Sequence, residues 1–148
     1  ASKISSKLDD IEVFDLAGTK IEKINNYDKI ILGGSTWGDG ELNDDWEDAW
    51  VDFCKLDLSN KTIALFGLGD QESYSDEFCS ALGEIYKQVV TLGAKVIGFT
   101  STEGYHHDAS KAQIDNNFVG LVIDEDNQSE LTDKRIEDWV QNIKEDIL

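Results

Sequence analysis

The chain has 148 residues, a length that predicts a single domain over residues 1–148 with a hydrophobic core of its own. It carries 31 acidic and 13 basic residues, a formal net charge of −18. This charge argues against a protein that grips nucleic acid by its phosphates and against one that adheres to anionic lipid. It favours docking on the basic faces of protein partners, although a highly soluble surface would give the same composition.

The two cysteines, Cys54 and Cys79, are too few for a disulfide framework or a zinc site. No signal-peptide pattern opens the chain and no apolar run approaches the length of a membrane span. We therefore expect a cytoplasmic protein without a membrane partner. Because methionine is absent, Ala1 is not an encoded start, and we expect that residues before it were cleaved, omitted or lost.

Short apolar runs alternate with helical patterns along the chain. Trp46, Trp50 and Phe53, for example, recur at the spacing of one helix face. In chain order, the first half is predicted to contain the end of a helix over 2–8, strands over 11–16 and 29–34, a helix around 44–53 and a strand over 62–67. A helix over 78–90 follows, capped by Ser75 and ended by Gly93. Strands over 95–99 and 118–123 are separated by a polar stretch, and a last helix around 136–147 is capped by Thr132.

This alternation predicts an α/β fold in which helices cover both faces of a parallel sheet. In such sheets ligands bind beyond the carboxyl ends of the strands. Three loops follow predicted strand ends and are the candidate ligand-binding segments, residues 35–40, 68–74 and 100–107.

The first of these loops places hydroxyls and a tryptophan directly after a strand, in the order Ser35, Thr36, Trp37, with two glycines around an aspartate further on. An exposed Trp in a turn offers a stacking surface to a flat ring. The alternative is a tight loop in which Trp37 packs on the helix that follows.

The second loop supplies another aromatic residue, Tyr74, after the next strand. Two aromatic side chains on adjacent loops could hold one planar ligand between them. Asp70 in the same loop could instead be a structural cap. The two glycines at 67 and 69 are no dinucleotide fingerprint, because no third glycine follows at the required offset.

Taken in order, the segments STWGDGEL, DDW, FGLGDQESYSDEF, EGYHHDASKA, FVGLVIDEDNQ and LTDKRIEDWV resemble the long-chain flavodoxins. The resemblance covers essentially all of the chain. It implies a three-layer α/β sandwich with a flavodoxin-like parallel sheet in the order 2-1-3-4-5. It also implies a monomeric electron carrier, not an enzyme, that holds one FMN noncovalently. The polar stretch before the last strand would be the insertion of the long-chain subgroup.

The resemblance also implies which residues bind FMN. Trp37 and Tyr74 would lie on the two faces of the ring, while Ser35 and Thr36 would serve the phosphate or the ring edge. The peptide between Gly38 and Asp39 would face flavin N5. Gly69 and Asp70 would contact the pyrimidine end or the ribityl chain, which Asp126 would also approach. The whole implied set is Ser35, Thr36, Trp37, Gly38, Asp39, Gly40, Leu68, Gly69, Asp70, Tyr74, Asp76, Phe78, Cys79 and Asp126.

The function implied is that of a low-potential one-electron carrier that shuttles between the semiquinone and the hydroquinone of FMN. The flavin carries the electron, and the protein sets its potential. The expected partners are basic faces of redox proteins, namely a flavodoxin reductase and low-potential electron donors or acceptors.

One departure from the family pattern is large. The family begins with a strand and a Thr/Ser-Gly-rich loop that binds the FMN phosphate, whereas this chain opens midway through the helix that follows them. With that strand 1 absent, the strand over 11–16 would have no partner. We therefore expect a channel in its place or another segment filling it, a loosely folded chain, and poor FMN binding unless a strand and loop are supplied.

The same residues bear on three other functions. A cofactor-free acidic binding module, or a non-functional fragment that lost the phosphate site, stays open, and a visible spectrum would decide it. A phosphoacceptor receiver domain is rejected, because Gly34 and Ser35 stand where it needs an Asp. His106 and His107, adjacent in a polar loop, are expected to be solvated and not to bind a metal.

Overall fold

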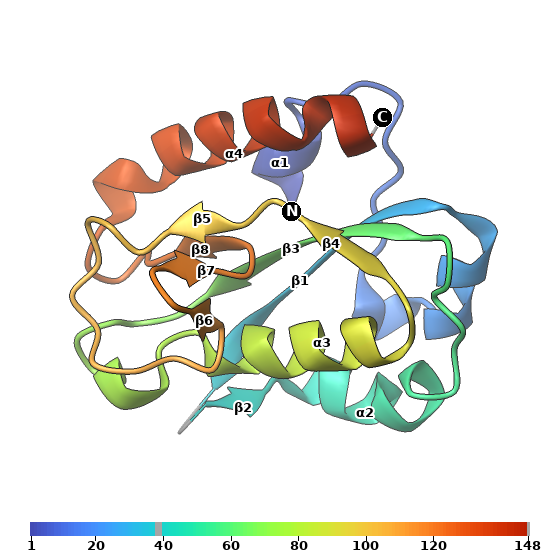
Figure 1. The fold of residues 1–148 in the computed structure, drawn as a ribbon, viewed down its shortest axis with the longest axis horizontal. Helices are drawn as coiled ribbons and strands as arrows, with labels where there is room; N and C mark the ends of the chain where they lie inside the picture. The colour runs from blue at the N-terminus through green and yellow to red at the C-terminus, as the bar shows by residue number, and fades with distance from the viewer. Residues whose placement is uncertain (38–39, 148) are drawn as a thin grey trace.

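The computed structural model describes residues 1–37 and 40–147 as three layers around a central sheet (Figure 1). Helices α1 (Ser2–Ser5) and α4 (Thr132–Ile147) cover one face of the sheet. Helices α2 (Asp44–Phe53) and α3 (Ser80–Thr91) cover the other. The predicted α/β sandwich is therefore confirmed.

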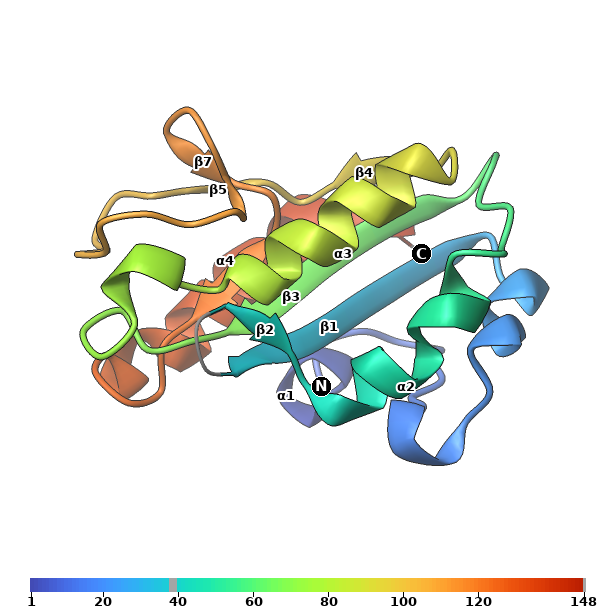
Figure 2. The same cartoon turned by 90° about the horizontal axis from the view of Figure 1, so that it is seen from below.

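Strand β3 (Thr62–Leu68) is the centre of the sheet. On one edge it pairs in parallel with β1 (Lys29–Trp37), from Lys29 opposite Thr62 to Ser35 opposite Leu68. On the other edge its first half pairs with β4 (Lys95–Ile97) and its second half with β8 (Leu121–Ile123), both in parallel. Figure 2 shows β1 and β3 side by side along their length.

The polar stretch between β4 and β8 forms a small antiparallel sheet of β5 (Thr100–Ser101), β7 (Asn117–Phe118) and β6 (Gln113–Ile114). The strand predicted over 118–123 is consequently split into β7 and β8. At the break Thr100 Oγ1 donates to the Gly120 carbonyl at 2.6 Å. The backbone N–H of Val119 donates to Ala112, so the residues between the two strands bond to the inserted segment and not to β3.

A local signal explains where α2 begins. The side chain of Asn43 accepts a hydrogen bond from Trp46 N at 3.1 Å and caps α2, whose first turn carries Asp44 and Asp45 as predicted. Trp46 and Phe53 are buried on its inner face. The short strand β2 (Glu41–Leu42) lies just before this helix and pairs antiparallel with the end of β1.

Two predicted N-caps are wrong. Ser75 opens a short 3-10 helix, η3 (Ser75–Glu77), and α3 starts five residues after Ser75, at Ser80, behind Cys79 in a left-handed conformation. Thr132 is already helical and is preceded by η4 (Ser129–Leu131). In both places an extra 3-10 turn precedes the α-helix, which hydroxyl residues alone do not reveal. The end of α3 before Gly93 is confirmed.

The strand predicted over residues 11–16 is also wrong. Residues 11–15 form no strand and lead into two 3-10 helices, η1 (Leu16–Gly18) and η2 (Ile21–Asn26). The Asp15 side chain accepts from Ala17 N at 3.0 Å and turns the chain there. A strand needs a neighbour to hydrogen-bond, and none of the described strands lies beside this segment.

A groove of about 650 Å³ separates this segment from β1. Among the described residues, β1 meets a strand on its outer edge only at Thr36 and Trp37, which pair with β2. The groove exposes the ends of both hydrophobic cores, since Ile30 belongs to the cluster under α2 and α3, and Ile31 to the cluster under α1 and α4. The expected channel beside β1 is thus present.

Candidate functional site at the carboxyl ends of β1 and β3

Two aromatic side chains stand exposed where the two longest strands end. Strands β1 and β3 run in register up to Ser35 and Leu68, so the loops that follow them start side by side. Trp37 is 49% exposed and Tyr74, in the second loop, is 47% exposed. Such large apolar surfaces at the ligand-binding end of an α/β sheet are suited to stacking on a flat ring. The exposure of Trp37 also counts against packing on the following helix.

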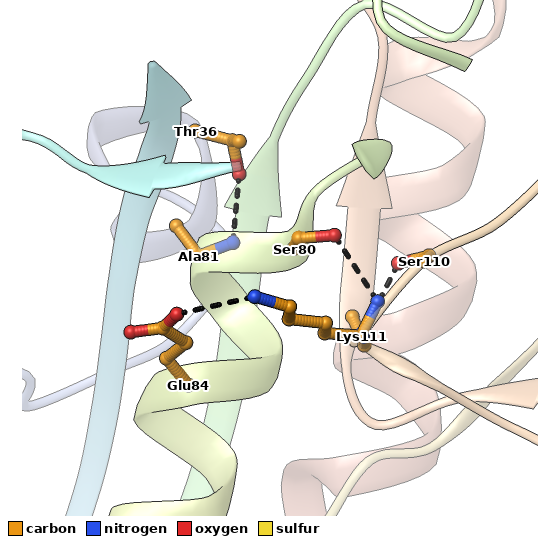
Figure 3. Close-up of polar contacts among 7 residues, drawn as sticks. Thr36, Ser80, Ala81, Glu84, Ser110 and Lys111 are labelled. Atoms are coloured by element: carbon orange, nitrogen blue, oxygen red, sulfur yellow. Dashed lines mark hydrogen bonds and ion pairs between the residues drawn. The ribbon is translucent and has the colours of Figure 1, made fainter. Parts of the chain in front are cut away.

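The backbone under Trp37 is held by its neighbours. Thr36 and Trp37 pair with β2, and Thr36 Oγ1 accepts from Ala81 N at 3.2 Å, which ties the loop to the first turn of α3 (Figure 3). Ser35 Oγ accepts a long 3.5 Å hydrogen bond from Asn43 Nδ2. Both hydroxyls predicted to contact a ligand thus already accept hydrogen bonds within the protein.

Gly40 closes the same loop in a conformation that favours glycine, with φ of +89°. A Cβ at this position would lie 2.6 Å from Glu77 Oε2, so the chain passes very close to η3. The two predicted site residues before it, Gly38 and Asp39, lie outside the described residues. The expected contact of their peptide with flavin N5 therefore stays a prediction.

The second loop is shaped by Asp70. Its Oδ1 accepts from Glu72 N at 3.1 Å and Ser73 N at 2.9 Å, and its carbonyl accepts from Tyr74 N at 3.1 Å. The hydrogen bond from Ser73 N, followed by one from the Asn127 side chain, lowers the pKa of Asp70. Asp70 is therefore a structural cap of the loop that carries Tyr74, as the alternative reading held.

A buried carboxylate that sequence reasoning missed lies beneath this loop. Asp124 directly follows β8 and is 0% exposed. It accepts hydrogen bonds from the backbone and side chain of both Gln71 and Asn127. Its position as the first polar residue after a buried strand next to β3 is the signal that could have found it. The sequence instead drew attention to Asp126, which is exposed.

The remaining predicted site residues divide by burial. Phe78 and Cys79 have buried side chains, at 0% and 1% exposure, so only their backbones could reach a ligand. Burial raises the pKa of the Cys79 thiol. Position 69 has no room for a side chain, because a Cβ there would lie 2.7 Å from Cys79 Sγ. Leu68 and Asp76 are exposed beside them.

The third strand-end segment contributes packing beneath the second loop. Phe78, Tyr105 and Phe118 pack in a mutual cluster of edge-to-face and tilted contacts, with ring centroids 5.0 to 5.9 Å apart. His107 joins it, with Nε2 2.6 Å from Gln113 Oε1, so the expectation of a solvated side chain is wrong for His107, while His106 is exposed. Within the described residues no three His, Cys, Asp or Glu side chains are grouped to hold a metal ion.

The inserted segment is pinned to the start of α3, as Figure 3 shows. Lys111 N donates to Ser80 Oγ at 3.1 Å, and Lys111 Nζ lies 3.6 Å from Glu84. Together with the bond between Thr36 and Ala81, these contacts make the first turn of α3 a shared anchor for the first loop and the insertion.

The arrangement suits a flat, uncharged ring better than a phosphate. Residues 35–42 and 68–79 contain no Lys or Arg, and both segments carry acidic residues in their sequence. Across residues 1–37 and 40–147, no helix is both long enough and apolar enough to span a membrane.

Comparison with known proteins agrees with this geometry. A profile of the flavodoxin family matches residues 1–139. A flavodoxin of Picosynechococcus sp. is 48% identical over 136 residues, 92% of this chain and 80% of that protein. One of Helicobacter pylori is 46% identical over 144 residues, 97% of this chain and 87% of that protein. The crystal structure of Fusobacterium nucleatum flavodoxin bound to flavin mononucleotide superposes with a TM-score of 0.93 at 35% identity, covering 99% of this chain and 89% of that one.

These matches extend over nearly the whole chain and do not confirm the expectation that a strand and a phosphate loop are missing. They agree with the order of motifs and with the arrangement of sheet and helices found here. The chain belongs to the flavodoxin family.

Proposed function

We propose that this protein is an FMN-binding, low-potential one-electron carrier that works between redox proteins. The observation that carries the proposal is the pair of half-exposed aromatic residues, Trp37 and Tyr74, on loops that leave adjacent strand ends. Relatives at 40–48% identity are flavodoxins, and a structural neighbour binds flavin mononucleotide. Bound FMN would supply the electron-transfer chemistry, and the protein would supply position and electrostatics.

Each side of the site has a distinct task in this proposal. Trp37 and Tyr74 would lie against the two faces of the ring and exclude water from it. Asp70 and Thr36 hold the two loops in place through the backbone N–H groups of Ser73 and Ala81. The acidic residues of the two loops would disfavour additional negative charge on a bound ring and so favour a low reduction potential.

The test is removal of the two aromatic faces. Trp37→Ala and Tyr74→Ala should each weaken FMN binding by about 1–3 kcal/mol, the range for an aromatic ring stacked on a base-like ring. Titration of FMN measures this, because stacked aromatics quench flavin fluorescence. Val51→Ala is the matched control, since Val51 is exposed and lies on α2 outside the site loops. The proposed stacking is wrong if the double variant keeps both affinity and quenching.

We further propose that tight FMN binding requires a strand beside β1 and a Thr/Ser-Gly-rich loop that leads out of it. The support is the open groove along β1, together with the absence of Lys and Arg from residues 35–42 and 68–79. A phosphate is held best by several backbone N–H groups at a helix N-terminus.

A chain extended by such a strand and loop should bind FMN about two to four decades more tightly than residues 1–148 alone, the difference that two charged hydrogen bonds make. A matched extension with the loop hydroxyls replaced by Ala separates the phosphate contacts from the added strand. Tight binding of one FMN by the unextended chain would contradict this part of the proposal.

The net charge of −18 supports basic redox proteins as partners of a cytoplasmic monomer. The rate of electron transfer from a basic reductase should then fall as the salt concentration rises, because screening shortens the range of attraction. A rate indifferent to salt would mean an apolar contact. The second candidate, an acidic binding module without cofactor, is favoured by the open groove, and it is rejected if the isolated protein shows flavin absorbance.

A further inference from the structure

We propose that Asp124 is a positioning residue for the ring-binding loop, and that it sets the orientation of Tyr74 without touching the ring itself. The inference rests on the proposed FMN function. Asp124 follows β8, the neighbour of β3, and the loop that carries Tyr74 follows β3. Its side chain is completely buried between the two strand ends.

Every hydrogen bond that the structure gives this carboxylate comes from a neutral donor. Oδ2 accepts from Gln71 N at 3.1 Å, from Gln71 Nε2 at 2.7 Å and from Asn127 Nδ2 at 2.9 Å. Oδ1 accepts from Asn127 N at 3.0 Å and from Nδ2 at 3.2 Å. An ionised carboxylate only accepts, so it satisfies all of these donors at once. An amide in its place would turn an NH2 group toward donors.

Asn127 links this buried carboxylate to the loop. Its Nδ2 also donates to Asp70 Oδ1 at 2.8 Å. Asp70 in turn accepts from the backbone of Glu72 and Ser73 and, through its carbonyl, from Tyr74 N. A continuous set of hydrogen bonds therefore runs from Asp124 to the residue that offers the ring face.

Gln71 joins a third segment to the same point. Its side chain is 1% exposed, and its Oε1 accepts from His106 N at 2.6 Å. The loops after β3 and β8 thus meet at Asp124, and the side chain of Gln71 ties the segment around His106 to them. Because Gln71 and Asn127 are held from both sides, the loop has a defined shape before any ligand binds, which lowers the entropic cost of binding.

The experiment compares Asp124→Asn with Glu125→Gln, which removes the same charge from the next, exposed position. Hydrogen exchange in the FMN-free protein should speed up about tenfold or more at the amides of residues 71–74 in Asp124→Asn, because these opening reactions lose charged hydrogen bonds. Glu125→Gln should leave exchange there unchanged. FMN affinity should fall about tenfold to a hundredfold in Asp124→Asn only.

A double-mutant cycle separates positioning from general destabilisation. In a Tyr74→Ala background, Asp124→Asn should cost little further affinity, since the residue that it positions is gone. An equal loss in both backgrounds would overturn the proposal, as would unchanged exchange at residues 71–74. If Asp124→Asn does not fold, Asn127→Ala tests the same link and should show the same pattern with smaller effects. If neither this chain nor the chain extended by a strand and a phosphate-binding loop binds FMN, the proposed function fails, while exchange in the FMN-free protein still decides the role of Asp124.

Discussion

The carboxyl end of β1 and its outer edge differ in what fixes the chain beside them: side-chain hydrogen bonds at the end, and backbone pairing along the edge. At the carboxyl ends of β1, β3 and β8, the side chains of Thr36, Asp70 and Asp124 accept hydrogen bonds from backbone N–H groups and fix the loops. Along its outer edge, β1 faces an apolar groove, and the segment across it stays irregular. A loop can be specified by a few local hydrogen bonds, whereas a strand takes shape only when its partner is present.

The largest expected effect contrasts two leucines in register across β1 and β3. Leu65, on β3, is 0% exposed, while its partner Leu32, on β1, lines the groove at 8% exposure. Leu65→Ala should lower the free energy of unfolding by about 3–5 kcal/mol, because it leaves a closed cavity. Leu32→Ala should cost about 2 kcal/mol, the lower end of the same range, because its space is continuous with the groove.

Urea unfolding followed by circular dichroism measures both changes on the same scale. Equal costs at the two positions would show that the groove is closed in solution. In a chain extended by a strand beside β1, the cost of Leu32→Ala should rise toward that of Leu65→Ala, because the same substitution would then leave an enclosed cavity.

A smaller effect concerns how low pH changes the loop that carries Tyr74. The hydrogen bonds from Ser73 and Asn127 hold the pKa of Asp70 below its ordinary value of 3.8. A carboxyl with a lowered folded pKa stabilises the fold above its unfolded pKa, and this contribution is lost as the pH falls through the folded value. Amides of Glu72 and Ser73 should therefore lose protection from hydrogen exchange below about pH 4, the ordinary range of an Asp.

Asp70→Asn is the matched variant for this acid transition, since it keeps the size of the side chain and removes the titration. Its exchange rates at residues 72 and 73, corrected for the intrinsic pH dependence, should not change between pH 5 and pH 3, in contrast to the parent protein, given an ordinary Asp pKa near 3.9. The same transition in both proteins would assign it to another carboxyl group.

How far the sequence could predict this molecule depends on whether the deciding interaction was local. The helical spacing of Trp46, Trp50 and Phe53 predicts α2, and the apolar runs over 29–34 and 62–67 predict β1 and β3. These predictions succeed because the side-chain pattern alone decides those elements. The strand over 11–16 failed because its partner is not among the described strands, and no pattern within the segment reports that.

The same distinction applies to the candidate site. Trp37, Tyr74 and the loops that carry them follow from strand ends and from the family motifs. The role of Asp124 depends on contacts with Gln71, 53 residues away in sequence, which only the fold brings together. The family resemblance placed Phe78 and Cys79 among the site residues, whereas both side chains are buried, at 0% and 1% exposure, just after the 3-10 turn η3.

The smallest expected effect is one of rate and leaves stability untouched. Both cysteines are free thiols. Cys79 lies just before α3 and is 1% exposed, and its burial raises the pKa of the thiol. Cys54 lies at the end of α2 and is half-buried. Only a thiolate attacks a disulfide reagent, so one thiol per chain should react quickly at pH 8 and the second only as the protein opens.

Cys54→Ser isolates the slow thiol, and its rate then reports opening of the loops above it. Asp124→Asn in that background should speed up the reaction, while Leu32→Ala, on the groove side, should change it less. If Cys79 reacts as fast as Cys54 in the parent protein, the loops at the carboxyl ends of β1 and β3 open as readily as the groove side of the sheet.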